Sequence, residues 1–252
     1  MESAAGTGVQ CLVAIDLTIN DIQDGRQDFT MHRTRIKICG LTREQDVQAA
    51  VAAGADAIGL VFYQQSPRYI APADAGRLIA ALPPFVTTTG LFVNASLEEV
   101  RAVLAQAPVS LLQFHGDERA AECAAIAQAV NRPFMRALRV KAEMSAADLL
   151  EYEAQYRAAS PLFSSLLLDA FVDGYGGGGK VFDWSLIPES IAPRVVLSGG
   201  LNAQNAAEAV RRIRPHAVDV SSGVEAAKGI KDAEKIRAFI GAVRAADAAQ
   251  PD

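Results

Sequence analysis

The chain has 252 residues, of which 50% are hydrophobic and 21% charged, and its net charge is -5. No apolar run approaches the ~18 residues of a membrane span, and the basic residues are scattered, so neither a membrane-spanning nor a nucleic-acid-binding protein is indicated and a small-molecule partner is favoured. Cys11, Cys39 and Cys123 have no metal-ligand spacing and are an odd number, which argues against a disulfide framework and favours a reducing, cytoplasmic compartment.

The first segment, residues 1–33, sustains neither a helical nor a strand period. It lacks the basic start and the long apolar core of a secretory signal. We expect a poorly ordered N-terminal extension, followed by a single domain over residues 34–252.

From Arg35 onward, short apolar stretches rich in β-branched residues recur, and most are followed by an alanine-rich amphipathic segment. They are R-I-K-I-C at 35, A-I-G-L-V-F at 57, T-T-T-G-L-F-V at 87, S-L-L-Q-F-H at 110, F-M-R-A-L-R-V at 134, S-L-L-L-D at 165, R-V-V-L-S at 194 and A-V-D-V-S at 217. Eight strand–helix units predict an α/β fold of the (β/α)₈ (TIM) barrel type in one domain. An open doubly wound sheet is the alternative, although it rarely needs eight such even units.

Several helix ends are marked in the sequence. Thr42 with Gln45 and Ser96 with Glu99 have capping-box spacing, and Asn202 precedes another amphipathic segment. Gly54 is an expected helix stop.

The first strand ends on a thiol. Ile36 and Ile38 share one face, while Lys37 and Cys39 share the other. In a barrel, active sites lie at the C-terminal ends of the strands, so we predict that Cys39 is functional and that the positive charge of Lys37 raises its thiolate fraction. The alternative is a small buried hydrophobe, which is the interpretation we adopt for Cys123.

Asp169 ends the sixth predicted strand, with Leu167 and Asp169 facing the barrel axis. A partly desolvated carboxyl has a raised pKa and suits a general acid near neutral pH. A thiolate base and a carboxylic acid would form a catalytic pair. The alternative is an aspartate that caps the following loop.

The last two strands end in L-S-G-G-L-N and D-V-S-S-G-V-E. Barrels often bind phosphate with the loops after strands 7 and 8, so we predict phosphate contacts from Gly199, Gly200, Ser222 and Gly223. These glycines would otherwise only end strands.

The segment D-G-Y-G-G-G-G-K at residues 173–180 approaches two nucleotide-binding motifs. Val181 replaces the hydroxyl that binds magnesium in one of them, and no helix follows at once, so we reject both interpretations. A lid that closes on a ligand and a plain mobile loop remain open.

Two further polar residues are candidates for binding. Arg68, on the proline-stiffened loop Y-Q-Q-S-P-R-Y-I, has the two-pronged donor face that grips a carboxylate. His115 points to the axis on the fourth strand beside Gln113, where a lone histidine is more often structural. The histidines have no ligand spacing, so no metal site is expected.

Six motifs follow one another from about residue 34 to the end of the chain. They are I-K-I-C-G-L-T, D-A-I-G-L-V-F-Y with S-P-R-Y-I, L-L-Q-F-H-G-D-E, L-L-L-D, L-S-G-G-L and V-D-V-S-S-G-V-E. This series resembles the motif series of phosphoribosylanthranilate isomerase. The family is usually shorter, so the N-terminal extension is a departure from it.

The resemblance implies an Amadori rearrangement of N-(5-phosphoribosyl)anthranilate in tryptophan biosynthesis, without cofactor or metal. It implies that Asp169 is the acid and Cys39 the base, and that Arg68 holds the anthranilate carboxylate. Asp219 would orient the anthranilate amine.

Monomers and homodimers are both compatible with this barrel. Two rival functions remain. One is another phosphate-binding barrel enzyme, such as a sugar-phosphate epimerase or an indole-glycerol-phosphate synthase relative. The other is a non-catalytic barrel that binds phosphoribosyl ligands.

Overall fold

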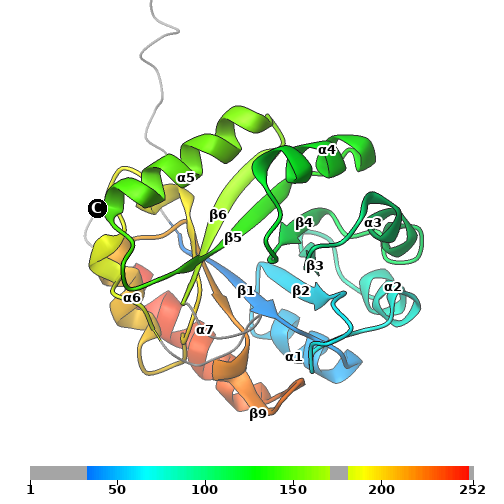
Figure 1. Ribbon diagram of the computed structural model, residues 1–252. Coiled ribbons are helices and arrows are strands. Elements are labelled where there is room, and N and C mark those ends of the chain that lie inside the picture. Colours follow the sequence, from blue (N-terminus) through cyan, green and yellow to red (C-terminus); the bar gives the residue numbers. More distant parts are fainter. Residues whose placement is uncertain (1–32, 171–180, 250–252) are drawn as a thin grey trace, which may run out of the picture. The chain divides into compact units, whose positions relative to one another are not determined.

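The computed structural model describes residues 33–170 and 181–249 (Figure 1). Its central feature is a closed barrel in which eight parallel strands follow one another in chain order. The strands are β1 (Arg35–Cys39), β2 (Ala57–Val61), β3 (Thr87–Phe92), β4 (Leu111–Phe114), β5 (Phe134–Val140), β6 (Phe163–Ala170), β7 (Val196–Leu197) and β8 (Ala217–Val220). The predicted fold class is therefore confirmed.

Helices lie between most of the strands and around the barrel (Figure 1). They are α1 (Glu44–Ala52), α2 (Pro72–Ala80), α3 (Leu97–Leu104), α4 (Ala120–Val130), α5 (Ala146–Ala159), α6 (Ala206–Ile213) and α7 (Ala233–Ala248), with short 3₁₀ turns at Trp184–Leu186, Ala192–Arg194 and Ser222–Val224. Among the described residues, no helix combines the length and the apolar character needed to cross a bilayer.

The strand alternation read from the sequence separates two cores. Ile36, Ile38 and Leu168 belong to the large cluster of buried apolar residues, which also includes residues of the helices. Leu167 belongs instead to a small second cluster that fills the barrel. Leu167 and Asp169 thus share the inward face, as period-two alternation requires.

Strand register explains why polar groups meet inside the barrel. Lys37 of β1 pairs in register with Asp219 of β8, and Cys39 pairs with Gly59 of β2. A Cβ atom at position 59 would lie 2.7 Å from the Cys39 Sγ atom. Gly59 therefore provides the space that the thiol occupies.

One predicted helix start and the predicted helix stop are confirmed, whereas two predicted helix starts are wrong. Ser96 and Glu99 form the expected reciprocal capping box at α3, and Gly54 (φ +93°) follows the end of α1. However, α1 begins after Arg43 without a side-chain cap, because the Thr42 hydroxyl donates to the Gly229 carbonyl instead.

The second error is at α6, whose N-cap is Asn205. Asn202 lies one turn earlier, where its side-chain oxygen accepts from the amides of Gln204 and Asn205.

A small hairpin after β8 was not predicted. It consists of β9 (Glu225–Ala227) and β10 (Ile230–Lys231), which pair antiparallel (Figure 1). A Cβ atom at Gly229, in the turn, would lie 2.6 Å from the Pro67 carbonyl oxygen, so the hairpin packs closely against the loop after β2.

The glycine-rich motif at 173–180 lies outside the described residues, and so do residues 1–32 of the predicted N-terminal extension. The interpretations given to these segments, and the domain boundary at residue 34, stay predictions.

Candidate active site

The C-terminal ends of the strands bring the predicted catalytic residues to one end of the barrel. Cys39 is the last residue of β1, Asp169 is the penultimate residue of β6, and His115 directly follows β4. All three side chains are buried. A thiol, a carboxyl and an imidazole are thus held in a largely dry environment.

A buried charged pair lies beneath the thiol. Lys37 Nζ donates to Asp219 Oδ1 at 2.8 Å, and Ser198 Oγ donates to Asp219 Oδ2 at 3.3 Å. Burial acts to lower the pKa of Lys37, but Asp219 and Cys39 more than offset it, so the pKa is raised and the side chain is an ammonium. Both oxygens of Asp219, predicted to orient the substrate amine, are occupied by protein groups.

The electrostatics of Cys39 differ from the expectation. Burial raises the pKa of the thiol above its ordinary value, and the positive charge of Lys37 opposes this shift without cancelling it. Lys37 therefore favours the thiolate, as predicted, but the net effect of the site is to keep more of Cys39 protonated than a free thiol.

Asp169 lies between an imidazole and a glycine loop. His115 Nε2 is 3.2 Å from Asp169 Oδ2, at contact distance but without the alignment of a good hydrogen bond. The other ring nitrogen, Nδ1, lies 3.0 Å from Gln113 Nε2. His115, predicted to bind substrate, thus contacts the proposed acid directly. On the other side, a Cβ atom at Gly199 would lie 2.9 Å from Asp169 Oδ1.

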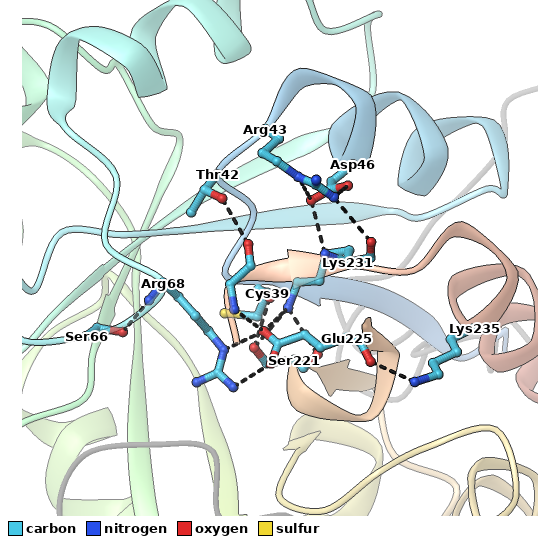
Figure 2. Close-up of polar contacts among 11 residues, drawn as sticks. Cys39, Thr42, Arg43, Asp46, Ser66, Arg68, Ser221, Glu225, Lys231 and Lys235 are labelled. Atoms are coloured by element: carbon cyan, nitrogen blue, oxygen red, sulfur yellow. Dashed lines mark hydrogen bonds and ion pairs between the residues drawn. The ribbon is translucent and has the colours of Figure 1, made fainter. Parts of the chain in front are cut away.

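Arg68 does reach this region, but it is already paired. Its Nε and Nη2 atoms donate to the two carboxylate oxygens of Glu225 at 2.7 and 2.9 Å. Its stem crosses Gly40, whose φ is +75° and whose added Cβ would lie 2.5 Å from Arg68 Cδ. Figure 2 shows Arg68 beside Cys39, with Glu225 to the right of the guanidinium. The guanidinium is close enough to the Cys39 thiol to interact with it electrostatically.

Lys231 completes this group. Its Nζ atom donates to Glu225 Oε1 at 2.9 Å and to the carbonyl and hydroxyl of Ser221 at 3.0 and 3.2 Å, and the same hydroxyl donates to the Cys39 carbonyl (Figure 2). Burial acts to raise the pKa of Glu225, but Arg68 and Lys231 outweigh it, so the pKa is lowered. Burial lowers the pKa of Lys231, against the opposing influence of Glu225.

Glu225 lies within the motif V-D-V-S-S-G-V-E, but the sequence pattern indicates no role for it and does not single out Lys231. A signal was present in the hairpin-like spacing of V-E-A-A-K-G-I-K, where a glycine separates two short polar-ended segments.

The loops after β7 and β8 lie against each other. A Cβ atom at Gly223 would lie 1.9 Å from the Leu201 carbonyl oxygen. Gly199 and Gly200 have φ values of +80° and +68°. The Asn205 side-chain amide fixes the first loop by donating to the Gly200 carbonyl at 3.0 Å. Within the described residues, the amides of Gly199 and Gly200 donate no backbone hydrogen bond.

The fold and the site define a (β/α)₈-barrel protein with a buried thiol and a buried carboxyl at the C-terminal ends of its strands, the end that carries the active site in barrel enzymes. Residues 36–242 match the sequence profile of the family described as N-(5'phosphoribosyl)anthranilate (PRA) isomerase. The chain belongs to this family of enzymes.

Individual relatives agree. The chain is 73% identical to the N-(5'-phosphoribosyl)anthranilate isomerase of Herminiimonas arsenicoxydans, over 88% of this chain and 98% of the relative. It is 58% identical to that of Ralstonia nicotianae, over 87% and 96% of the two chains.

Solved structures of this enzyme are also similar. The crystal structure from Thermotoga maritima superposes with a TM-score of 0.74 at 42% identity and covers 84% of this chain and 99% of its own. A second structure, solved in complex with reduced 1-(o-carboxyphenylamino)-1-deoxyribulose 5-phosphate, has a TM-score of 0.71 at 40% identity and the same coverage.

Proposed function

We propose that the chain converts N-(5'-phosphoribosyl)anthranilate to 1-(2-carboxyphenylamino)-1-deoxyribulose 5-phosphate in tryptophan biosynthesis, with Asp169 as general acid and Cys39 as general base. The observation that carries the proposal is the placement of both groups, buried and each beside its own polar partner, at the C-terminal ends of β6 and β1. Membership of the isomerase family supports the substrate.

In the first step, the Asp169 carboxyl gives a proton to the ring oxygen of the ribose. The C1–O bond breaks while the nitrogen lone pair forms a C=N bond, which opens the furanose to a protonated Schiff base. His115 Nε2 lies 3.2 Å from Asp169 Oδ2, which leaves the other carboxyl oxygen for the substrate. A positioned acid of this kind typically contributes at least ~100-fold.

In the second step, the Cys39 thiolate removes the proton from C2. The electron pair of the C–H bond forms a C1=C2 double bond and neutralises the Schiff base, which gives an enolamine. Loss of the O2 proton and gain of a proton at C1 then produce the ketone. The substrate as a whole is neither oxidised nor reduced. The thiolate acts only as a base and forms no covalent bond with carbon.

The phosphate group would lie on the loops after β7 and β8. Their close packing, the adjacent Ser222 and Gly223, and the amides of Gly199 and Gly200, which donate to no backbone acceptor among the described residues, suit an anion. Backbone N–H groups bind anions well. Gly199 also adjoins Asp169, so an anchored phosphate would hold the ribose near the acid.

Arg68 would hold the anthranilate carboxylate with donors that Glu225 leaves unused. We expect Arg68→Ala to raise KM by about tenfold or more, because a charge-assisted hydrogen bond to substrate is lost, while kcat changes less. Steady-state kinetics measure both constants, and an unchanged KM would remove the anchoring role.

The pH dependence of the reaction tests the thiolate. Since burial raises the pKa of Cys39, the thiolate fraction, and with it kcat/KM, should rise as pH increases through the thiol pKa. The neutral variant Lys37→Met with Asp219→Asn removes both charges without leaving one buried alone. Lys37 lowers the thiol pKa more than Asp219 raises it, so the rising limb should move to higher pH. If the rising limb of kcat/KM against pH does not move in this variant, a group other than Cys39 controls it.

The reaction itself is tested with substrate carrying ¹³C at ribose C2. The proposal predicts that the C2 resonance moves from the carbinol to the ketone region. A sugar-phosphate epimerase would keep C2 as a carbinol, an indole-glycerol-phosphate synthase relative would form no such ketone from this substrate, and a binding protein would leave the resonance unchanged. Any of these three outcomes would refute the proposal.

A further inference from the structure

One side chain, that of Glu225, holds the guanidinium of Arg68 in its orientation. Glu225 takes the edge formed by Nε and Nη2 in a two-point contact at 2.7 and 2.9 Å. Nη1 makes no hydrogen bond to any described residue. An arginine has five N–H donors in a rigid plane, so three remain for a second acceptor, and their direction is set by Glu225.

Glu225 is itself immobilised. Its carboxylate is buried and accepts from Lys231 Nζ at 2.9 Å and from the Gly229 amide at 3.3 Å. The Gly229 turn packs on the Pro67 carbonyl, next to Arg68 in the chain. The hairpin after β8 therefore fixes both the carboxylate and the loop that carries the arginine.

The charge balance of this group favours an anion. Lys231 Nζ has three acceptors, namely Glu225 Oε1 and the carbonyl and hydroxyl of Ser221. Three acceptors match the three N–H groups of an ammonium, whereas a neutral amine has only two. Arg68 and Lys231 against Glu225 leave one net positive charge. Without Lys231, Glu225 alone would neutralise Arg68 and little attraction for a second carboxylate would remain.

We propose that Glu225 is a positioning residue that aims Arg68 at the aromatic carboxylate of the substrate, and that Lys231 keeps the Arg68–Glu225–Lys231 cluster positive enough to bind it. The selectivity for a carboxylated aniline over a plain aniline then comes from the hairpin Glu225–Lys231 as much as from Arg68. This inference rests on the proposed function, because it takes Arg68 as the carboxylate anchor.

The test compares two ligands. One is reduced 1-(o-carboxyphenylamino)-1-deoxyribulose 5-phosphate, and the other is the same molecule without the ring carboxyl. Glu225→Gln keeps the shape and makes the cluster one unit more positive, but it removes the two-point ion pair that orients Arg68. A weaker hold on the carboxylate in this variant therefore reports lost orientation and not lost charge. We expect its Kd for the carboxylated ligand to rise by about tenfold or more, as for a misaligned charge-assisted hydrogen bond, and its Kd for the other ligand to change little. Lys231→Met should shift the two Kd values in the same way.

Two further variants make the result specific. Glu225→Asp keeps the charge, but its shorter side chain draws Arg68 away from the substrate, so this variant should also lose the preference for the carboxylated ligand. It replaces Glu225→Gln in the test if that variant folds poorly. In an Arg68→Ala background, Glu225→Gln should add almost nothing. Glu153→Gln is the matched control, because Glu153 is a buried carboxylate that binds Arg157 and Arg194 and has no contact with the cluster. It should keep the full preference.

The other outcomes would refute either the positioning role of Glu225 or the anchoring role of Arg68. If Glu225→Gln and Glu225→Asp retain the wild-type preference, or weaken both ligands equally, the positioning role is refuted while the proposed function stands. If the wild type itself shows no preference for the carboxylated ligand, Arg68 is not the anchor, and this inference falls together with that part of the proposed function.

Discussion

Replacing Cys39 with alanine is expected to lower kcat by at least ~100-fold, the usual minimum contribution of a general base. The thiol is the group at the end of β1 that would accept the C2 proton, and the methyl group of alanine cannot. Cys39→Ser should be as slow, since an alcohol ionises far less readily than a thiol. Steady-state turnover with freshly prepared substrate measures the effect.

The matched control is Cys123→Ala. Cys123 is also a buried thiol, but it lies on α4 in the apolar cluster between barrel and helices. Its replacement should leave kcat unchanged. Near-normal turnover of Cys39→Ala, or an equal loss in both variants, would contradict the assignment of the base.

The raised pKa of Cys39 is consistent with this role. A base whose conjugate acid has a higher pKa holds a proton more strongly, which favours removal of a carbon-bound proton. The same shift reduces the fraction of enzyme that carries the thiolate at neutral pH. Lys37, held by Asp219, limits that reduction. In the proposed mechanism the buried pair thus balances the strength of the base against the fraction of enzyme that carries the thiolate.

Asp169→Asn is expected to lower kcat by at least ~100-fold as well. Asparagine has nearly the same shape and can still contact His115, but it has no acidic proton to give to the ring oxygen. The variant should nevertheless bind reduced 1-(o-carboxyphenylamino)-1-deoxyribulose 5-phosphate with close to wild-type affinity, because this ligand has an open chain and needs no ring opening.

Asp247→Asn serves as the control for this variant. Asp247 is a partly buried aspartate on α7 that accepts from the Thr34 amide and hydroxyl near the N-terminal end of β1, the opposite end of the barrel from the site. Full turnover is expected there. If Asp169→Asn turned over normally, or lost affinity for the open-chain ligand as much as it lost rate, Asp169 would not be the acid.

The sequence predicted those parts of the site that depend on local alternation. Period-two patterning placed Lys37 and Cys39 on one face of β1 and Asp169 inward on β6, and the barrel rule then placed the strand ends together. These are short-range regularities, so the fold, the strand order and the gathering of these side chains at one end of the barrel followed from them.

The parts that the sequence did not reveal depend on contacts between distant segments. Arg68 and Glu225 are 157 positions apart, and their pairing requires the hairpin after β8 to pack on the loop after β2. The strands of that hairpin are too short to show a period. The Thr42 capping box failed for the same reason, since the Gly229 carbonyl of this turn takes the Thr42 hydroxyl.

The direction of the net shift in the Cys39 pKa could not be predicted from the sequence either. The neighbouring charge of Lys37 is visible in the alternation, whereas the degree of burial that outweighs it depends on how β1 and β2 pack around the thiol.

The most direct test of the account is the decay of anthranilate-type fluorescence with freshly made N-(5'-phosphoribosyl)anthranilate, measured in the presence of a metal chelator. The wild-type chain and the double variant Cys39→Ala with Asp169→Asn are compared at equal concentration. Rapid decay that scales with wild-type concentration is expected, and decay with the double variant should be no faster than in buffer alone. Wild-type decay at the buffer rate, or double-variant decay at the wild-type rate, would contradict the account.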